Sequence, residues 1–482
     1  MDHYRYIRTV LPPYEHQQRC MNEAVDRCLS DGYHALFMDM GTGKTKTTLD
    51  TLAALVEYGR ADALMVVCPK SIIGVWQDEV PKHFANPVSV HAWNGKSTKK
   101  TNEDFEMVLR APVAVMLVNV ESFQTLPETM HYRVKQFLTT RRALMAVDES
   151  HFIKQMDARR TKAVISAGKL AKHRLILTGT EITTSILDLY SQFEFLKPGF
   201  WGIKSFYQFK LRYAVLQDSY GAGGRTFKKI VGFQRVNELM DHVTMHISRA
   251  KIEDCLDLPE KIKIVMYVDM SEPQAKAYKN LKDSLVAMIN DSLLTVQNKI
   301  SLFAKFRQIT GGSVNVDGNV EVLDPHPPKL QALLDDVSTN DEQVIVWAAF
   351  THEIRMISEA LSKIGSCVTF FGETKTDERL ENVHAFQDGT VRFFVANPRA
   401  GGFGLNLQNC HIQYFYSRDL QPAANWQAEA RSHRNGQQHA CIYKTLVARG
   451  TVDERVEALL DKNTDLRMAV RDMTIQDIVS II

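Results

Sequence analysis

The sequence lacks the features of a membrane or secreted protein. No uninterrupted apolar stretch in its 482 residues is long enough to cross a bilayer, which takes about 20 helical residues. The N-terminal residues, MDHYRYIRTVLPPYEHQ, contain no apolar core of a secretory signal. The seven cysteines are scattered without a CxxC pair or a His/Cys cluster, so no structural zinc is expected. These absences predict a cytoplasmic protein with reduced thiols and no membrane partner.

The sequence also has little net charge and no low-complexity tract. Its 58 Lys and Arg residues nearly balance 56 Asp and Glu residues, which leaves a formal net charge of +2. Any binding to nucleic acid must therefore come from local placement of charge. One such cluster lies between Lys154 and Arg174, where seven Lys or Arg residues accompany a single acid, Asp157. Taken alone, this run is more simply interpreted as a solvated helix face.

The chain does contain a regular alternation of short apolar runs and helix-length segments. In the first third, the runs predicted as buried strands are 35–38, 61–67, 113–118, 143–147 and 174–178. The segments predicted as helices include 44–58, 73–83 and 159–171. Strands that are apolar throughout and separated by helices are typical of a parallel sheet covered on both faces.

A different pattern separates this region from a second one of the same kind. Residues 200–250 are rich in aromatic residues and have a helical pattern. A glycine-rich stretch at 219–229 interrupts this pattern and indicates a hairpin. Strand-like runs resume later as QVIVWAAF, SCVTFF, VRFFVA, CHIQYFY and CIYKTLV. We therefore expect an α/β protein with two tandem lobes and a cleft between them. The expected divisions are lobe 1 (1–198), a helical protrusion and linker (199–260), and lobe 2 (261–482) with a helical insertion (271–310) and C-terminal helices.

The strongest motif is MGTGKT, which follows the strand at 35–38 and opens the helix at Lys44. Its residues are Met40, Gly41, Thr42, Gly43, Lys44 and Thr45. The glycines let backbone N–H groups close around phosphate, and the helix N-terminus adds partial positive charge. Lys44 would reach the β- and γ-phosphates, and the Thr45 hydroxyl would join a magnesium shell. Met38 stands where the strict phosphate-loop pattern has glycine, so this is a variant loop.

A pair of carboxylates, Asp148 and Glu149, ends the strand predicted at 143–147. A solvated turn would explain such a pair if it stood alone. Ligands collect at the C-terminal ends of parallel strands, however, and a phosphate loop precedes this pair by about a hundred residues. Asp148 is therefore expected to hold magnesium through water, and Glu149 to polarise the attacking water.

The second lobe contains QAEARSHRNGQ, in which Arg431 and Arg434 are three residues apart. On a helix this spacing would place both on one face. Guanidinium groups suit the charge that develops on a γ-phosphoryl group, so an arginine from a second lobe would make hydrolysis depend on closure. A surface Arg/His face is an equally good interpretation of this stretch by itself.

In this order, YEHQ, MGTGKT, VVCPKS, DESH, LTGT, ANPRAGGFGLNL and QAEARSHRNGQ resemble the motif series of superfamily-two helicases. More narrowly, the stretches LTGTEITTSILDLYSQFEFLKPGFWG and SRDLQPAANWQAEARSHRNGQ are similar to those of Swi/Snf-type DNA-dependent ATPases. The resemblance covers nearly the whole chain. It implies two RecA-like lobes that bind ATP between them and double-stranded DNA across the cleft.

The resemblance also implies roles for individual residues. Gln17 would recognise adenine, although the adjacent Gln18 permits a shift by one position. Arg431 and Arg434 would be arginine fingers, and Gly404 would belong to the nucleotide site. The residues expected at DNA, or between DNA and the nucleotide, are Lys70, Ser71, Thr178, Gly179, Thr180, Gly401, Gly402 and Asn406. Ser150 and His151 would pass the nucleotide state toward LTGT and the second lobe. Two departures stand out: Glu181 replaces a common proline, and Arg249 stands alone where the family has two arginines.

The resulting prediction is an ATP- and Mg²⁺-dependent translocase that remodels or reanneals double-stranded or branched DNA. The helical region between the lobes is short, and the stretch KLRYAVLQDSYGAGGRTFKKIVG is similar to the hairpin-bearing segment of the annealing-helicase branch. A motor this compact would suit a bacterium or a virus. In a virus, the expected location is the host cytoplasm. The alternatives are a strand-separating helicase, a motor subunit of a larger DNA-processing complex, and a non-hydrolysing DNA-binding scaffold. Protein partners would come from replication, repair or recombination.

Overall fold

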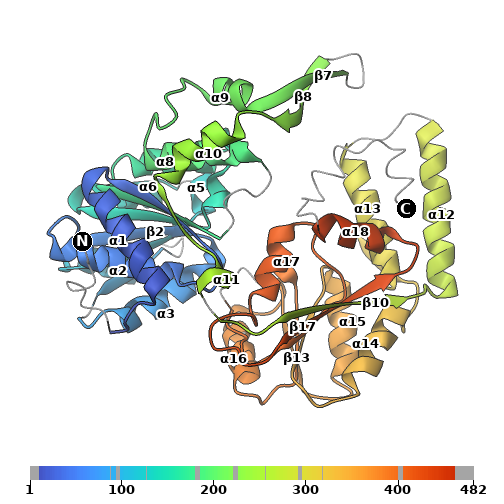
Figure 1. Ribbon diagram of the computed structural model, residues 1–482. Helices are drawn as coiled ribbons and strands as arrows, with labels where there is room; N and C mark the ends of the chain where they lie inside the picture. The colour runs from blue at the N-terminus through green and yellow to red at the C-terminus, as the bar shows by residue number, and fades with distance from the viewer. Residues whose placement is uncertain are drawn as a thin grey trace. The chain divides into compact units, whose positions relative to one another are not determined.

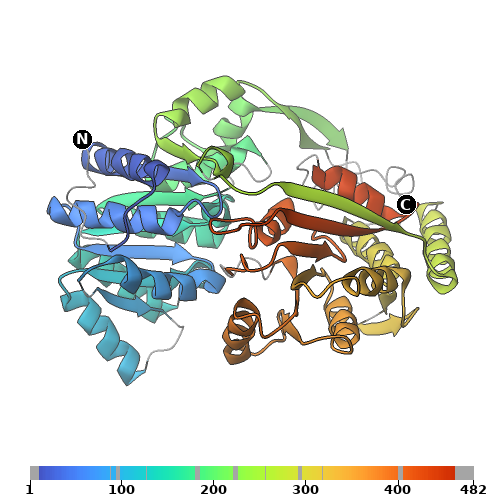
Figure 2. The same cartoon turned by 60° about the horizontal axis from the view of Figure 1, so that its bottom comes forward.

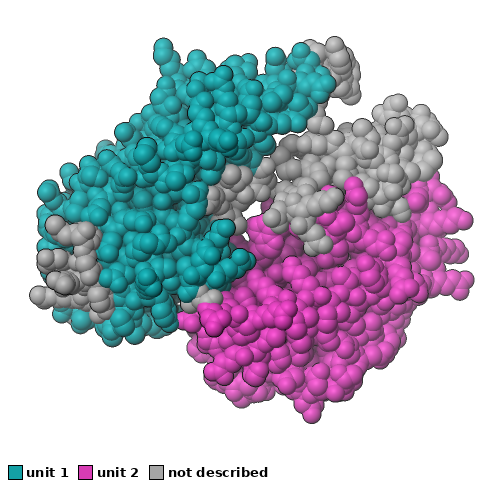
Figure 3. All heavy atoms as spheres, in the orientation of Figure 1, with its two compact units in different colours: residues 1–256 teal, residues 257–482 magenta. Residues whose placement is uncertain are grey.

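The computed structural model divides the chain into two compact units, residues 1–256 and 257–482 (Figure 3). The structure describes residues 10–86, 88–93, 98–125, 127–179, 185–220, 226–255, 257–290, 296–316, 318–399 and 405–461. Within these residues, no helix is both long enough and apolar enough to cross a membrane.

The first unit is built on a seven-stranded sheet in the order β3-β4-β2-β5-β6-β1-β9, with every neighbouring pair parallel (Figure 1). The strands are β1 (Tyr33–Met38), β2 (Ala63–Cys68), β3 (Ser89–Ala92), β4 (Ala114–Asn119), β5 (Ala143–Asp148), β6 (His173–Thr178) and β9 (Ile247–Ala250). The central strands are buried along their length because helices cover both faces. The five strands predicted in this region are confirmed.

Two hydrophobic clusters, one on each face, hold the helices to this sheet. The first cluster joins alternate strand residues to α1 (Glu15–Ser30), α2 (Lys44–Glu57) and α3 (Ile73–His83). The second joins the other strand residues to α4 (Lys99–Arg110), α5 (Ser122–Thr125), α6 (Glu128–Thr140), α7 (Arg159–Gly168) and α8 (Leu189–Leu196). Short 3-10 turns precede or follow some of these helices: η2 (Lys70–Ile72), η3 (Ser150–Ile153) and η4 (Ile186–Asp188). Figure 2 shows the helices on both faces of the sheet.

The region from 200 to 255 is less helical than predicted. It contains α9 (Phe206–Tyr213), α10 (Val236–Thr244) and α11 (Ile252–Cys255), and the expected hairpin is present as β7 (Ala214–Tyr220) and β8 (Thr226–Phe233). The antiparallel pair runs outward from the helices in Figure 1. Strand β9 was not predicted. It pairs with β1 in parallel, so this region returns to the sheet of the first unit.

The second unit has a six-stranded, all-parallel sheet in the order β10-β17-β16-β13-β15-β14. Its strands are β10 (Lys261–Val268), β13 (Val344–Trp347), β14 (Cys367–Phe370), β15 (Phe393–Ala396), β16 (Ile412–Phe415) and β17 (Cys441–Ala448). One hydrophobic cluster includes side chains of α14 (Pro328–Val337) and α15 (Thr351–Leu361), and another includes side chains of α16 (Thr376–Gln387) and α17 (Pro422–Glu429). The predicted fold class of two α/β lobes with parallel sheets is confirmed.

The helical periodicity predicted over 271–310 is confirmed by α12 (Glu272–Asn290) and α13 (Val296–Thr310). A small antiparallel pair, β11 (Ser313–Val316) and β12 (Asn319–Val322), follows them. Helix α18 (Val452–Asp461) packs beside α13, where Phe303 and Phe306 share a cluster with Val452 and Val456. These helices are therefore part of the packed core of the second unit.

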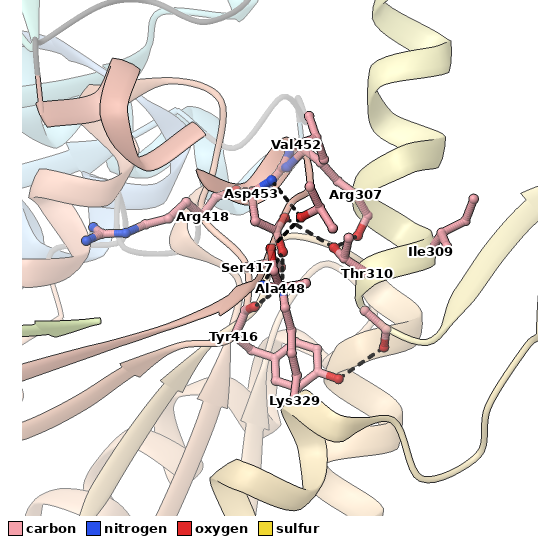
Figure 4. A network of polar contacts seen from close by, with 12 residues as sticks. Arg307, Ile309, Thr310, Lys329, Tyr416, Ser417, Arg418, Ala448, Val452 and Asp453 are labelled. Carbon is pink, nitrogen blue, oxygen red and sulfur yellow. Dashed lines mark hydrogen bonds and ion pairs between the residues drawn. The ribbon is translucent and has the colours of Figure 1, made fainter. Parts of the chain in front are cut away.

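A buried polar network joins these helices to the sheet (Figure 4). The Lys329 ammonium lies 2.5 Å from Asp453 Oδ2, and the Thr310 hydroxyl donates to Asp453 Oδ1 at 3.1 Å. The Tyr416 hydroxyl donates to the carbonyl of Gly311 at 3.0 Å, and Arg307 donates to the carbonyl of Arg418. Because unpaired buried charges are costly, each pairing fixes the position of α13 and α18 against the sheet.

Glu353 in α15 makes the stability of the second unit depend on pH. Burial raises the pKa of its carboxyl to about 7, although Ser417, Lys329 and Arg307 oppose the shift. Between the ordinary pKa and 7 the folded chain binds more protons than the unfolded chain, so stability is lost as the pH rises through 7. We expect the free energy of unfolding to fall by about 1 kcal/mol from pH 6 to pH 8. Glu353→Gln should remove this dependence in denaturant titrations; an unchanged dependence would contradict the assignment.

Candidate active site

The predicted phosphate loop lies between β1 and α2 and bends back over itself. Gly41 and Gly43 have φ values of 83° and 93°, which only glycine adopts without strain. The Lys44 ammonium donates to the carbonyls of Met38 at 2.9 Å and Asp39 at 3.2 Å. The Thr42 hydroxyl donates to the same Asp39 carbonyl at 2.7 Å. These bonds place the cation of Lys44 at the C-terminal edge of β1, where a phosphate would compete for it.

Two side chains from the start of α1 hold the loop from the other side. Gln17 Nε2 donates to the Thr42 carbonyl at 3.0 Å, and His16 Nε2 lies 2.8 Å from the same oxygen. Gln17 Oε1 accepts from the Tyr14 backbone N–H at 3.1 Å. Gln17, predicted at adenine, is thus bound to the loop itself. His16 was not singled out from the sequence, because the motif drew attention only to the glutamine beside it.

Gly43 fits so closely against Gln17 that a side chain would disturb the loop. A Cβ atom at this position would lie 2.2 Å from Gln17 Nε2. Gly43→Ala is expected to raise the KM for ATP at least about tenfold, or roughly 1.4 kcal/mol, because loop and glutamine must both shift. Gly59→Ala is the matched control, since Gly59 also has positive φ, +65°, but nothing lies within 4 Å of its Cβ position. Equal KM values for the two variants would contradict this role of Gly43.

The two carboxylates lie at the C-terminal end of β5, which is separated from β1, the strand before the loop, by β6. Asp148 is 7% exposed, and its Oδ1 accepts from the Glu149 backbone N–H at 2.9 Å. Burial raises the pKa of Asp148 to about 6, the negative charge of Glu149 adds to the shift, and Lys44 opposes it. Glu149 has φ 52°, a conformation rare for a non-glycine residue and frequent at functional sites. His151 Nδ1 lies 3.3 Å from Glu149 Oε2.

The chemistry of these residues fits a magnesium ion brought in with nucleotide. Burial disfavours the charged form of a carboxylate, and a nearby cation stabilises that form. Mg²⁺ usually binds one or two protein oxygens together with phosphate and water. Asp148 supplies the carboxylate, and Thr45 stands at the second position of α2. No cluster of three His, Cys, Asp or Glu residues able to hold a metal occurs in the described part of the chain.

The residues after β6 and β5 connect the site to neighbouring elements. Strands β1 and β6 pair with Phe37 opposite Thr178, so Gly179 lies next to the loop. A Cβ atom on Gly179 would lie 3.4 Å from Lys44 Nζ. The Ser150 hydroxyl donates to Gln192 in α8 at 2.5 Å, consistent with a structural link rather than chemistry at Ser150. Thr180 and Glu181 lie outside the described residues.

The second unit brings Arg431 and Arg434 together, but not on a helix. Helix α17 ends at Glu429, before either arginine, so the prediction that one helix carries both is wrong. Beyond the helix end, the Arg431 carbonyl accepts a tertiary hydrogen bond from the Leu407 N–H at 3.0 Å. Both guanidinium groups nevertheless donate to the Leu405 carbonyl, at 3.4 and 3.2 Å. The expected juxtaposition is thus produced by a turn.

The residues predicted at DNA lie on separate elements. Lys70 is exposed, and its backbone N–H donates to Glu121 at 3.3 Å, while Ser71 belongs to η2. Asn406 is exposed, and its carbonyl accepts from Gln387 at 2.6 Å. Gly401, Gly402 and Gly404 lie outside the described residues. In the basic run, Lys162, Lys169 and Lys172 are exposed, as a solvated face requires.

Comparison with known proteins identifies the family. The SNF2-related domain matches residues 16–312, more than half of the chain, and the helicase conserved C-terminal domain matches residues 327–436. The chain belongs to the SNF2 family of ATPases. This membership accounts for the joint presence of the phosphate loop, the carboxylate pair and two RecA-like lobes.

The SNF2-family relatives are distant and larger. The chain is 26% identical to chromodomain-helicase-DNA-binding protein 1-like of Mus musculus, over 87% of this chain and 45% of the relative. It is 23% identical to the DNA repair and recombination protein RAD54-like of Danio rerio, over 89% and 62%. It thus spans less than two thirds of the length of each of these relatives. The SWI2/SNF2 ATPase core of Sulfolobus solfataricus, solved with double-stranded DNA, shows 23% identity and a TM-score of 0.44 over 98% of this chain and 95% of that one.

Proposed function

We propose that this SNF2-family chain is an ATP-driven translocase on double-stranded DNA. The observation that carries the proposal is the convergence of Lys44, Asp148 and Glu149 on one edge of the first sheet, in a chain of this family. Lys44 already contributes to the electrostatics of Asp148, so phosphate, magnesium and attacking water would meet at one place.

In the proposed reaction, the Lys44 ammonium exchanges its loop carbonyls for β- and γ-phosphate oxygens. Asp148 and Thr45 would hold the magnesium ion, and the ion would neutralise charge on the phosphates. Glu149 orients the attacking water and accepts its proton. Arg431 and Arg434 of the second unit stabilise the charge on the γ-phosphoryl group, as paired guanidinium groups suit. Gln17 and His16 hold the loop in its conformation through the Thr42 carbonyl and position it for the adenine nucleotide.

For DNA, we propose contacts dominated by the phosphate backbone. Lys70 and Ser71 lie in η2, just before α3 in the first unit, and Gly401, Gly402 and Asn406 belong to the second. Thr178, Gly179 and Thr180 link this surface to the nucleotide, and the place of Gly179 beside Lys44 supports that link. Binding should therefore be independent of sequence and weaken steeply with salt.

The experiment is a comparison of ATP hydrolysis with duplex, forked, four-way-junction and single-stranded DNA, and with RNA. We expect the strongest stimulation by DNA that contains duplex, with a preference for branched structures if the chain remodels or reanneals them. Stimulation by RNA alone, or by no nucleic acid, would contradict the substrate. A strand-separating helicase, or the motor of a larger complex, would instead unwind forks or need a protein partner for stimulation.

A further inference from the structure

The Trp76 side chain joins α3, the helix after β2, directly to Asp148, the carboxylate proposed above to hold magnesium. Its indole Nε1 donates to Asp148 Oδ2 at 3.0 Å, and the side chain is only 1% exposed. The two residues are 72 positions apart in the sequence. They meet because β2 and β5 are parallel neighbours, with Val67 opposite Val147, so their C-terminal ends lie side by side.

The contact gives each oxygen of a buried carboxylate a hydrogen-bond donor. Asp148 Oδ1 is held by the Glu149 N–H, and Oδ2 is held by the indole. Two fixed donors on two oxygens determine the rotation of the carboxylate and the direction of its remaining lone pairs. Partners of this kind behind a metal-binding group typically change metal affinity or activity 10- to 100-fold when they are removed.

The indole also lies in the first turn of α3, close to the residues proposed to meet DNA. Lys70 and Ser71 form η2, which leads directly into α3 at Ile73. Trp76 is anchored in the cluster that includes Val80 of the same helix. A ligand that displaces η2 and α3 must therefore displace the indole, and with it the donor on Asp148.

We propose that Trp76 is a positioning residue that sets the orientation of Asp148 and makes it depend on the position of α3. The inference rests on the proposed function, because it assigns a DNA-responsive element to that same site. Trp76 has no part in bond making or breaking. Its contribution is the geometry of the carboxylate that holds magnesium.

The test is the Mg²⁺ dependence of ATP hydrolysis for Trp76→Phe, with and without duplex DNA, together with the Mg²⁺ dependence of equilibrium binding of a fluorescent ATP analogue. We expect the Mg²⁺ concentration for half-maximal rate to rise about tenfold, with recovery of the rate at high Mg²⁺. The Mg²⁺ concentration for half-maximal binding of the analogue should rise as well. At saturating Mg²⁺, the ratio of DNA-stimulated to basal rate should fall severalfold, because α3 no longer acts on Asp148. An unchanged Mg²⁺ dependence would overturn the positioning role, and an unchanged ratio would overturn the dependence on α3.

Trp201→Phe is the matched control. Trp201 is also buried in the first unit, but its indole donates to the Tyr190 carbonyl at 3.1 Å, away from the site. If Trp76→Phe melts well below this control, the same Mg²⁺ titration is repeated with 3-benzothienylalanine at position 76. That side chain keeps the ring volume and removes only the N–H donor, so its result tests the positioning role. An unaltered chain that hydrolyses no ATP under any condition would instead refute the proposed function, so the two failures are distinguishable.

Discussion

Replacing Glu149 with glutamine is expected to slow ATP hydrolysis by roughly 10²–10⁴-fold, the usual contribution of a general base. Glutamine keeps the size of the side chain and its ability to accept a hydrogen bond, but it cannot take the proton of the attacking water. The phosphate loop and Asp148 are unchanged, so nucleotide binding should persist. Single-turnover hydrolysis and equilibrium binding of a fluorescent ATP analogue measure the two properties separately.

Glu128→Gln is a suitable control, because Glu128 is an exposed residue at the start of α6. It should hydrolyse ATP at the rate of the unaltered chain. Turnover by Glu149→Gln within a few-fold of that rate would remove Glu149 from its role. Loss of ATP binding together with turnover would show that the residue shapes the pocket and does not activate water.

Removing both arginines of the second unit is expected to lower kcat by roughly 10³–10⁵-fold, the range found for arginine fingers. The guanidinium groups of Arg431 and Arg434 meet at the Leu405 carbonyl, so they should act as a pair. The double alanine variant should then be little slower than either single variant. The KM for ATP should change much less than kcat, because the charge they stabilise develops only during reaction.

Lysine at both positions would keep the charge but lose the planar fork, and we expect it to restore little activity. Arg455→Ala, at an exposed position of α18, is the control for loss of a surface arginine from the same unit. A double variant that keeps kcat within tenfold of the unaltered chain would exclude both residues from the transition state.

The elements around the phosphate loop were predictable because their formation is a local matter. Strands β1, β2 and β5 are short apolar runs buried on both faces, and α2 begins at the lysine of the motif. The loop glycines have positive φ, as the motif requires. The carboxylates then lie at strand ends by the geometry of any parallel sheet.

The elements that escaped prediction depend on distant partners. Strand β10 mixes lysines with apolar residues and is largely exposed, but it pairs over its full length with β17, about 180 residues later. Strand β9 is only four residues long and is defined by its pairing with β1. The bond from Trp76 to Asp148 and the end of α17 before Arg431 likewise depend on tertiary contacts that no local spacing reveals.

The most direct test of the central claim is displacement of the third strand from a DNA triplex, since an enzyme that tracks along duplex must dislodge it. With ATP, the unaltered chain should release the third strand while the underlying duplex stays paired. Glu149→Gln, or the unaltered chain with a non-hydrolysable ATP analogue, should release none. Release without hydrolysis, or separation of a forked duplex with no triplex displacement, would contradict an ATP-driven translocase on double-stranded DNA.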